Sequence, residues 1–297
     1  MSSVHRHGFQ PGRRLAAAFA ANTAFLVFEV VFGLVAGSMA LLGDAGHNFS
    51  DSFALVLSLV AARAMSRPKT EGKTFGYHRM GIIVAFVNSL FVTGICFFLA
   101  YGAIRRFIDP VDVRGSMVIA VAGVGFLVNG SVALLLRAGR DDLNLRSAFL
   151  HLLTDALVSL GVVVSGVVVL LTGWAFVDPA ITLCIALLIM VSAFQIMRES
   201  THILMESVPL GVDYRDILSD ISGTPGVVGV HDLHIWEIGS HIYSLSAHIV
   251  VEDTRLSELR ETIAGLKEML RRDHNVVHVT LEPETEACLP DEECHFS

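Results

Sequence analysis

The sequence contains few charged residues. Only 17% of its 297 residues are Asp, Glu, Lys or Arg, whereas 53% are hydrophobic. Soluble globular domains average about 25% charged residues. This deficit excludes an ordinary soluble protein for most of the chain and predicts a membrane protein. The long apolar stretches lie between residues 15 and 200, whereas the segment from residue 211 has the composition of a soluble domain.

The sequence also lacks a disulfide framework. Of the four cysteines, Cys96 and Cys184 lie inside apolar stretches, where a small buried thiol is the simplest interpretation. Cys288 and Cys294 lie beside His295 near the C-terminus. For these three residues, metal binding and an unordered tail both stay open.

No cleavable signal segment is convincing. The apolar stretch from Leu15 to Ala36 is longer than a typical signal peptide core, so we interpret it as a retained first span. The net charge of −8 is concentrated in acidic segments near the C-terminus, such as Asp291-Glu-Glu293. Nucleic acid is therefore not an expected partner, whereas cations are.

Six apolar segments predict six transmembrane helices in an α-helical membrane domain. Each is close to the ~20 residues that a spanning helix needs, and they cover residues 15–37, 40–64, 79–103, 114–137, 147–172 and 176–197. Most basic loop residues lie on the side that also holds both termini. The positive-inside rule then places both termini in the cytoplasm of a multi-pass protein of the inner or plasma membrane.

Three regions follow from this pattern. We expect a cytoplasmic tail over residues 1–14, the membrane domain over 15–200 and a cytoplasmic domain over 206–297. In the last region, apolar spacing predicts helices over residues 213–221 and 255–272. Alternation predicts strands over 227–238, 242–251 and 276–281, with a turn at Gly239-Ser240. The order αββαβ predicts a small two-layer α+β domain of ferredoxin-like type.

The pattern His-x-x-x-Asp occurs twice inside apolar segments, as His47/Asp51 and His151/Asp155. Residues four apart lie on one face of a helix, one turn from each other. Ionisable side chains are unfavourable at membrane depth unless they pair, line a cavity or bind a ligand. Two imidazoles and two carboxylates from two helices are suitable ligands for a tetrahedral divalent metal ion. The sequence therefore predicts a metal site within the membrane domain.

The ligand types favour Zn²⁺ over Mg²⁺ or Ca²⁺. Imidazole suits zinc, copper, cobalt and nickel, whereas magnesium and calcium prefer oxygen ligands. The same four groups also bind protons, so that metal and H⁺ compete for them. This competition allows metal ions to be exchanged for protons. Cadmium and cobalt stay open as alternative substrates.

Asp44 and Glu29 are further acidic residues in the apolar segments. Asp44 extends the polar stripe of His47 and Asp51 and is a candidate auxiliary ligand. Glu29 lies seven residues after Asn22, on the same helical face. Glu29 either faces the cation path or accepts a hydrogen bond from a neighbouring helix.

These motifs together resemble the cation diffusion facilitators, most closely their zinc branch. The resemblance covers about residues 15–285 and includes the two His-x-x-x-Asp motifs in the second and fifth spans. It also includes Phe75-Gly-Tyr-His-Arg79 before the third span, Asp178-Pro179 before the sixth, and His231-Asp-Leu-His-Ile-Trp236. It implies a homodimeric, proton-coupled exporter of divalent metal ions with a metallochaperone-like cytoplasmic domain. It also implies that His47, Asp51, His151 and Asp155 are the transport ligands.

The resemblance further implies a cytoplasmic metal site at His231, His248 and His278, with Zn²⁺ in a structural or regulatory role. Glu282 either completes this site as an auxiliary ligand or is a solvated acidic residue. Half-buried histidines of a sheet are the alternative interpretation. Many zinc-branch relatives have a histidine-rich loop after the fourth span, which this sequence lacks. Met80-Gly81 follow His78-Arg79 where many relatives have an acidic residue, so we predict a structural or interfacial role for His78.

Two other functions are alternatives to transport. An intramembrane metalloenzyme needs an open coordination position and usually a nearby general base. The sequence contains no His-Glu-x-x-His motif, and four ligands would close the site, so we do not expect an enzyme. A membrane metal sensor is compatible with the cytoplasmic histidines but gives no reason for four ligands inside the bilayer.

Overall fold

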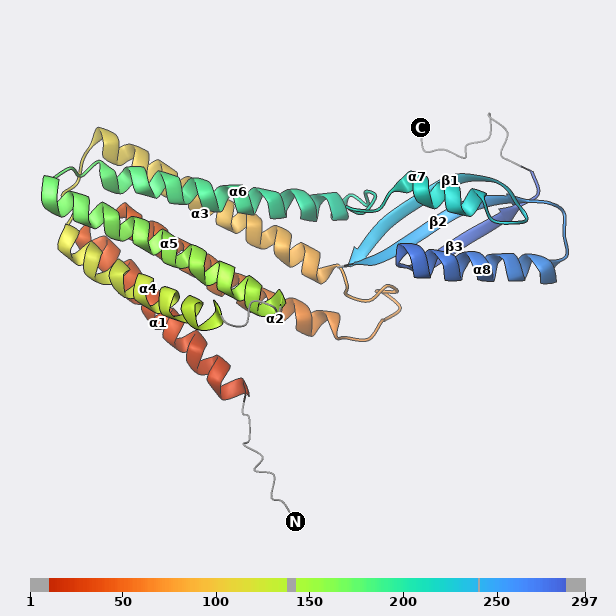
Figure 1. Cartoon of the computed structure of the whole chain (residues 1–297), viewed down its shortest axis with the longest axis horizontal. Helices are drawn as coiled ribbons and strands as arrows, with labels where there is room; N and C mark the ends of the chain where they lie inside the picture. The colour runs from red at the N-terminus through yellow and green to blue at the C-terminus, as the bar shows by residue number, and fades with distance from the viewer. Residues whose placement is uncertain (1–10, 138–142, 240, 287–297) are drawn as a thin grey trace, which may run out of the picture. The chain divides into compact units, whose positions relative to one another are not determined.

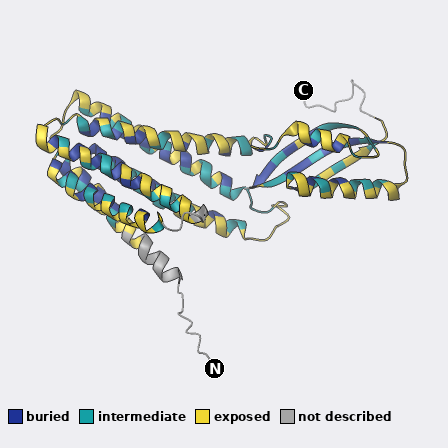
Figure 2. Cartoon of the chain, viewed as in Figure 1, coloured by how far each residue is buried: buried dark blue, intermediate teal, exposed yellow. Residues whose placement is uncertain are grey.

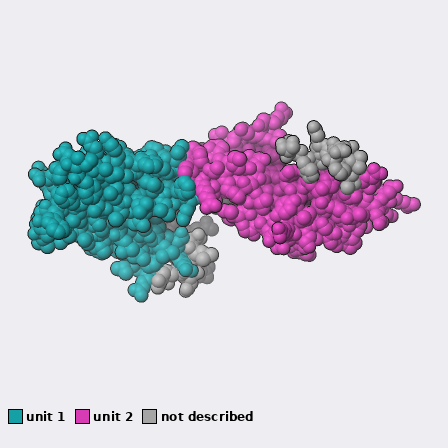
Figure 3. Space-filling model, turned by 90° about the horizontal axis from the view of Figure 1, so that it is seen from above, with its two compact units in different colours: residues 1–57, 88–195 teal, residues 58–87, 196–297 magenta. Residues whose placement is uncertain are grey.

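The computed structural model describes residues 11–137, 143–239 and 241–286. The chain divides into two compact units, one of residues 1–57 and 88–195 and the other of residues 58–87 and 196–297 (Figure 3). The second unit thus includes the end of one long helix, the start of the next and the loop between them, in addition to the expected C-terminal domain.

Each of the six apolar segments forms a helix within the described part of the chain (Figure 1). Their bounds are α1 (Pro11–Ala36), α2 (Met39–Met65), α3 (Met80–Ile108), α4 (Gly115–Leu136), α5 (Leu143–Thr172) and α6 (Val177–Leu204). In the described residues, four of these helices, α3 to α6, are long and apolar enough to cross a membrane. The protein therefore has a helical membrane domain, and the count of six spans stays a prediction.

Small residues allow the helices of the first unit to pack closely. A Cβ atom on Gly115 of α4 would lie 2.5 Å from the carbonyl oxygen of Gly166 of α5, so only glycine fits this contact. Buried aliphatic residues such as Leu41, Val118 and Val162 form a core between the helices. Large apolar side chains such as Leu127 and Leu135 lie on the outer surfaces (Figure 2), where lipid would contact them.

A very short turn joins α1 to α2. Gly37 has φ of +67°, a backbone conformation that L-residues with side chains rarely adopt. A Cβ atom at this position would lie 2.7 Å from the carbonyl oxygen of Asp112. Glycine is therefore required both by the backbone angle and by the neighbouring loop.

The C-terminal part of the second unit is the expected α/β domain. It contains α7 (Tyr214–Ser222), β1 (Val227–Gly239), β2 (Ile242–Val251), α8 (Leu256–His274) and β3 (Val276–Glu284). The side chain of Asp213 caps α7 by accepting a hydrogen bond from the amide of Arg215 at 2.8 Å. The predicted helices and strands are confirmed to within a few residues, although Ser240 of the predicted turn lies outside the described residues.

The described strands form a sheet of order β1-β2-β3, in which β2 pairs antiparallel with β1 and parallel with β3. Alternate residues of β2, including Leu245 and Ile249, are buried on the face that packs against Ile217 of α7 and Leu266 of α8. Both helices thus contribute to one core with one face of the sheet, which confirms the two-layer arrangement. The order αββαβ has no strand before α7 in the residues described, so a full ferredoxin-like fold is not established.

Candidate metal sites

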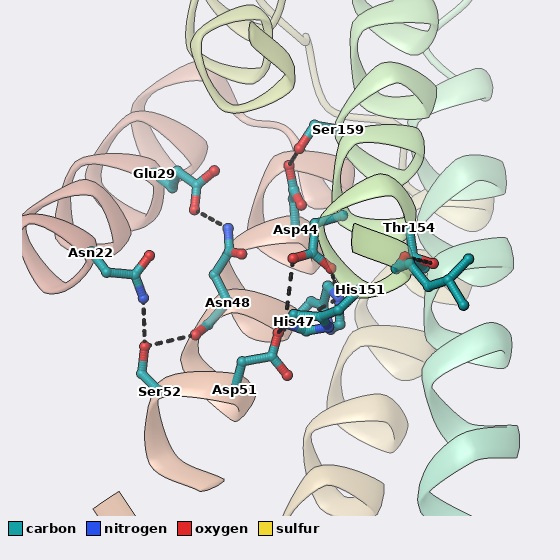
Figure 4. Close-up of polar contacts among 12 residues, drawn as sticks. Asn22, Glu29, Asp44, His47, Asn48, Asp51, Ser52, His151, Thr154 and Ser159 are labelled. Atoms are coloured by element: carbon teal, nitrogen blue, oxygen red, sulfur yellow. Dashed lines mark hydrogen bonds and ion pairs between the residues drawn. The ribbon is translucent and has the colours of Figure 1, made fainter. Parts of the chain in front are cut away.

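The structure brings the two His-x-x-x-Asp motifs together between α2 and α5 (Figure 4). His47 Nε2 lies 3.1 Å from Asp155 Oδ1 and 3.9 Å from Asp51 Oδ2. His151 Nε2 lies 3.6 Å from Asp51 Oδ2 and 3.6 Å from Asp155 Oδ2. Each imidazole thus approaches both carboxylates. Metal–ligand bonds of about 2.0 Å in a tetrahedron place ligand atoms about 3.3 Å apart, close to these separations.

The four side chains are not equally placed for metal binding. Ligand atoms of His47, Asp51 and Asp155 all lie within 4.8 Å of one another, whereas His151 approaches only the two carboxylates. The side chain of Asp155 is 8% exposed and that of His47 is 16% exposed. Asp51 is 35% exposed and His151 is 54% exposed. The group therefore combines two largely buried side chains with two more exposed ones.

Buried polar contacts hold α2 in place beside this group. Asp44, predicted as an auxiliary ligand, is buried and accepts a hydrogen bond from Ser159 of α5 at 2.9 Å. On the other side, Asn48 of α2 donates to Glu29 of α1 at 2.8 Å. Glu29 therefore accepts the hydrogen bond from a neighbouring helix that one of its two interpretations predicted, and a place on the cation path stays a prediction.

A second group of metal-ligand type lies in the α/β domain. His231 on β1 is directly opposite His248 on β2, with ring centroids 5.1 Å apart. Glu284, at the end of β3, lies with Oε2 2.9 Å from His231 Nε2 and Oε1 2.6 Å from His248 Nδ1. The ligand atoms of these three residues lie within 4.8 Å of one another. Partial burial opposes ionisation of Glu284, but its hydrogen bonds with His248 and His231 outweigh this effect and lower its pKa.

Further carboxylates surround the other nitrogen of His248. Its Nε2 atom lies 3.7 Å from Asp232 and 3.7 Å from Glu282, which was predicted as an auxiliary ligand. His234 contacts Asp232 at 3.0 Å. Asp232 has φ of +50° and lies at a register irregularity between β1 and β2. This bulge brings the Asp232 carboxylate close to both histidines.

His278, the third histidine of the predicted cytoplasmic site, lies elsewhere on the sheet. The parallel register pairs it with Ser244, and its ring makes an edge contact with Phe75 at a centroid distance of 5.5 Å. Glu284 contacts His231 and His248, in the position that was predicted for His278. Alternation along β3 places His278, Glu282 and Glu284 on one face, but it does not say which of them lies beside His248.

The remaining candidate ligands have other surroundings. His78 lies against the end of β1, where a Cβ atom on Gly239 would be 2.8 Å from the Cβ atom of His78. This close contact fits the structural role predicted for His78. Cys288, Cys294 and His295 lie outside the described residues.

A helical membrane domain with paired imidazoles and carboxylates, joined to an α/β domain with a second such group, defines a membrane protein that handles divalent metal ions. The comparison with protein families identifies the class more closely. Residues 15–205 match the cation efflux transmembrane domain, and residues 209–286 match the cytoplasmic domain of cation efflux proteins. The chain belongs to the cation efflux family, whose members are transporters and not enzymes.

Characterised relatives match nearly the whole chain. A "Cadmium, cobalt and zinc/H(+)-K(+) antiporter" of Bacillus subtilis is 35% identical over 287 residues, 95% of this chain and 92% of the relative. The "Zinc transporter ZitB" of Escherichia coli is 32% identical over 301 residues, 100% of this chain and 94% of the relative. The solved metal-bound C-terminal domain of the CzcD transporter from Cupriavidus metallidurans is 38% identical and covers 25% of this chain and 99% of that chain, with a TM-score of 0.23. The family match and the Bacillus subtilis and Escherichia coli relatives support divalent metal efflux by this protein.

Proposed function

We propose that this protein exports Zn²⁺ from the cytoplasm in exchange for protons, by alternating access to a site at His47, Asp51, His151 and Asp155. The observation that carries this proposal is the convergence of both imidazoles on both carboxylates, at separations of 3.1 to 3.9 Å. Two carboxylates neutralise a dication, and two nitrogen ligands favour zinc over magnesium or calcium.

Proton coupling follows from the same four groups. Histidine must be neutral and aspartate ionised to bind a metal ion, so metal binding releases protons. When the site opens to a more acidic exterior, protons return to the ligands and favour metal release. The inward proton gradient thus drives metal outward. Both termini on the cytoplasmic side are part of this proposal.

A broader substrate range is the second candidate. The Bacillus subtilis relative is named for cadmium and cobalt as well as zinc. A His₂Asp₂ ligand set accepts each of these ions, and the choice depends on the geometry of the site. Cadmium or cobalt export would leave the ligand assignments unchanged.

The α/β domain is proposed to bind Zn²⁺ at His231, His248 and Glu284 and to form a homodimer with a second copy. The three ligand types and their mutual distances support the metal site. The match to the cytoplasmic domain of cation efflux proteins supports the dimer. Metal binding there would have a structural or regulatory role, since the group lies in the α/β domain rather than between α2 and α5.

Zinc flux in proteoliposomes tests the proposed function. Purified protein is reconstituted with a zinc-sensitive dye inside the vesicles, and zinc is added outside. We expect zinc accumulation that accelerates when the interior is made acidic and is accompanied by alkalinisation of the interior. Zinc binding without any flux would instead indicate a membrane metal sensor.

A further inference from the structure

Glu29 is a fully buried carboxyl group that lies outside the four proposed metal ligands. Its side chain is 0% exposed within the helical unit. Oε2 accepts a hydrogen bond from Asn48 Nδ2 at 2.8 Å, whereas the buried Oε1 has no hydrogen-bond partner among the described residues. One oxygen is therefore held by α2 and the other is free to bind a ligand.

Polar side chains continue from Glu29 along the contact between α1 and α2 (Figure 4). Ser52 donates to the backbone oxygen of Asn48 at 3.0 Å and accepts from Asn22 at 2.8 Å. Asn22 is exposed and lies seven residues before Glu29, about 10 Å along the α1 axis. We call Asn22, Ser52, Asn48 and Glu29 the α1–α2 polar ladder. It leads from an exposed amide to a buried acid.

The surroundings of Glu29 do not stabilise an isolated negative charge. No lysine or arginine forms an ion pair with it in the described part of the chain, and its one hydrogen-bond donor is a neutral amide. The ionisable groups that interact with it electrostatically are Asp44 and His47, both on α2. Burying an uncompensated carboxylate is strongly unfavourable. A bound proton or small monovalent cation would remove this penalty.

The chemistry of the ladder differs from that of the metal site. It contains no imidazole or thiol, and its groups are amides, a hydroxyl and one carboxyl group. Such groups suit protons and hard cations rather than zinc. A single carboxyl group also matches the charge of a monovalent cation.

We propose that Glu29 binds a further monovalent cation, exchanged in addition to the protons of the four metal ligands, and that the α1–α2 polar ladder is its route. This inference rests on the proposed function and adds a second counter-ion site, separate from the protons exchanged at His47, Asp51, His151 and Asp155. Asn48, which holds Glu29, directly follows His47 on α2. Occupancy of either site therefore acts on the same segment of α2, and this shared segment couples the two ions.

The test separates coupling from metal transport. Glu29→Gln keeps the size of the side chain and an acceptor for Asn48 but removes the acid. We expect this variant to bind zinc with affinity close to that of the parent and to carry zinc down its own gradient. Its coupled cation flux should fall relative to the parent, because the protons of the four metal ligands are still exchanged whereas the cation of Glu29 is not.

Two gradients identify the cation. One set of vesicles has a pH gradient in potassium-free choline medium, and the other has a potassium gradient at equal pH. A response to pH that is weaker than that of the parent in Glu29→Gln assigns a proton to Glu29, and loss of the response to potassium assigns K⁺. Glu29→Asp, which restores an acid one methylene shorter, should recover part of the coupling and shows that the loss is specific to the acid.

The results distinguish a failure of the inference about Glu29 from a failure of the proposed function. If the parent carries zinc and Glu29→Gln retains full coupling, the inference about Glu29 is wrong and the proposed function stands. If Glu29→Gln is folded but loses zinc binding, Glu29 belongs to the metal site and the inference is also wrong. If the parent binds zinc but carries none, both proposals fail.

Discussion

Asp178, near the start of α6, accepts a hydrogen bond from the backbone amide of Met39 at 2.7 Å and thereby caps the first turn of α2. The carboxylate is fully buried and also accepts a hydrogen bond from Ser38. Arg106 of α3 lies 3.7 Å from it. A carboxylate next to a helix N-terminus is stabilised by the unpaired amides and by the helix dipole. The helix that carries His47 is therefore anchored at its start by a residue more than 130 positions away.

This anchor predicts a loss of stability in Asp178→Ala. Removing the carboxylate leaves buried amide and hydroxyl donors without their acceptor, which costs about 1–3 kcal/mol. We expect a lower thermal unfolding temperature in detergent. Asp178→Asn is the matched control, because it keeps an acceptor oxygen and should lose less. Equal unfolding temperatures for all three proteins would contradict the capping role.

The proposed transport site predicts that Asp51→Ala or Asp155→Ala abolishes zinc-driven proton flux. Each change removes a ligand that approaches both imidazoles, so the site can neither neutralise a dication nor exchange it for protons. Proton flux is measured with a pH-sensitive dye inside proteoliposomes. Asp109→Ala, at an exposed carboxylate in the same unit, should retain full flux. Flux that survives either ligand change would show that the site is misplaced.

Metal selectivity should depend on His47. In His47→Asp the ligand set contains one imidazole and three carboxylates, and the preference for zinc that nitrogen ligands provide weakens. Isothermal titration with zinc and cadmium should give a zinc preference reduced about tenfold relative to the parent, a free-energy difference of about 1.4 kcal/mol. An unchanged ratio of the zinc and cadmium affinities would show that His47 does not determine the metal selectivity of the site.

The cytoplasmic group allows a matched comparison between Glu284 and His278. Glu284→Gln removes the carboxylate that contacts both His231 and His248, so zinc affinity at this group should fall about 10- to 100-fold. His278→Ala should leave the affinity unchanged, because His278 faces Phe75 instead. Titrations in an Asp51→Ala background isolate this site from the membrane site. If His278→Ala lowered the zinc affinity more than Glu284→Gln, a site of His231, His248 and His278 would be supported instead.

The lowered pKa of Glu284 predicts a pH-dependent contribution to stability in the metal-free protein. The folded state holds the carboxylate in ionised form below its ordinary pKa of 4.5. The contribution is therefore present above about pH 4.5 and is lost as the pH falls through the lowered folded-state pKa. Thermal melts of the parent and Glu284→Gln should differ at mildly acidic pH and converge at lower pH. A difference in unfolding temperature that grows on further acidification would contradict the lowered pKa of Glu284.

Local patterns in the sequence were sufficient to predict most elements. Apolar length predicted the six helices, and alternation predicted the strands of the α/β domain, because both depend only on neighbouring residues. The spacing of four in each His-x-x-x-Asp motif predicted which side chains share a helical face. The structure contains the contacts between the two motifs that this prediction requires.

Features that depend on long-range register were not predictable. Glu284 replaces His278 because β3 runs parallel to β2, with His278 opposite Ser244 and Glu284 near the strand end that carries His248. Alternation gives the face of a strand but not its offset from the neighbouring strand. The capping of Met39 by Asp178 also could not be predicted from the sequence, because it joins the starts of two helices that are distant in sequence.

The turn at Gly37 has a mechanical consequence. Only Gly37 and Ser38 separate α1 from α2, and Gly37 packs closely against Asp112. The connection between the two helices is therefore short and has little room to move. The two helices therefore form a stiff hairpin, in which a tilt of one arm is transmitted to the other at the bend. Lengthening this bend by inserted glycines would let the arms tilt independently, so that ion movements along one arm would no longer be transmitted to the other.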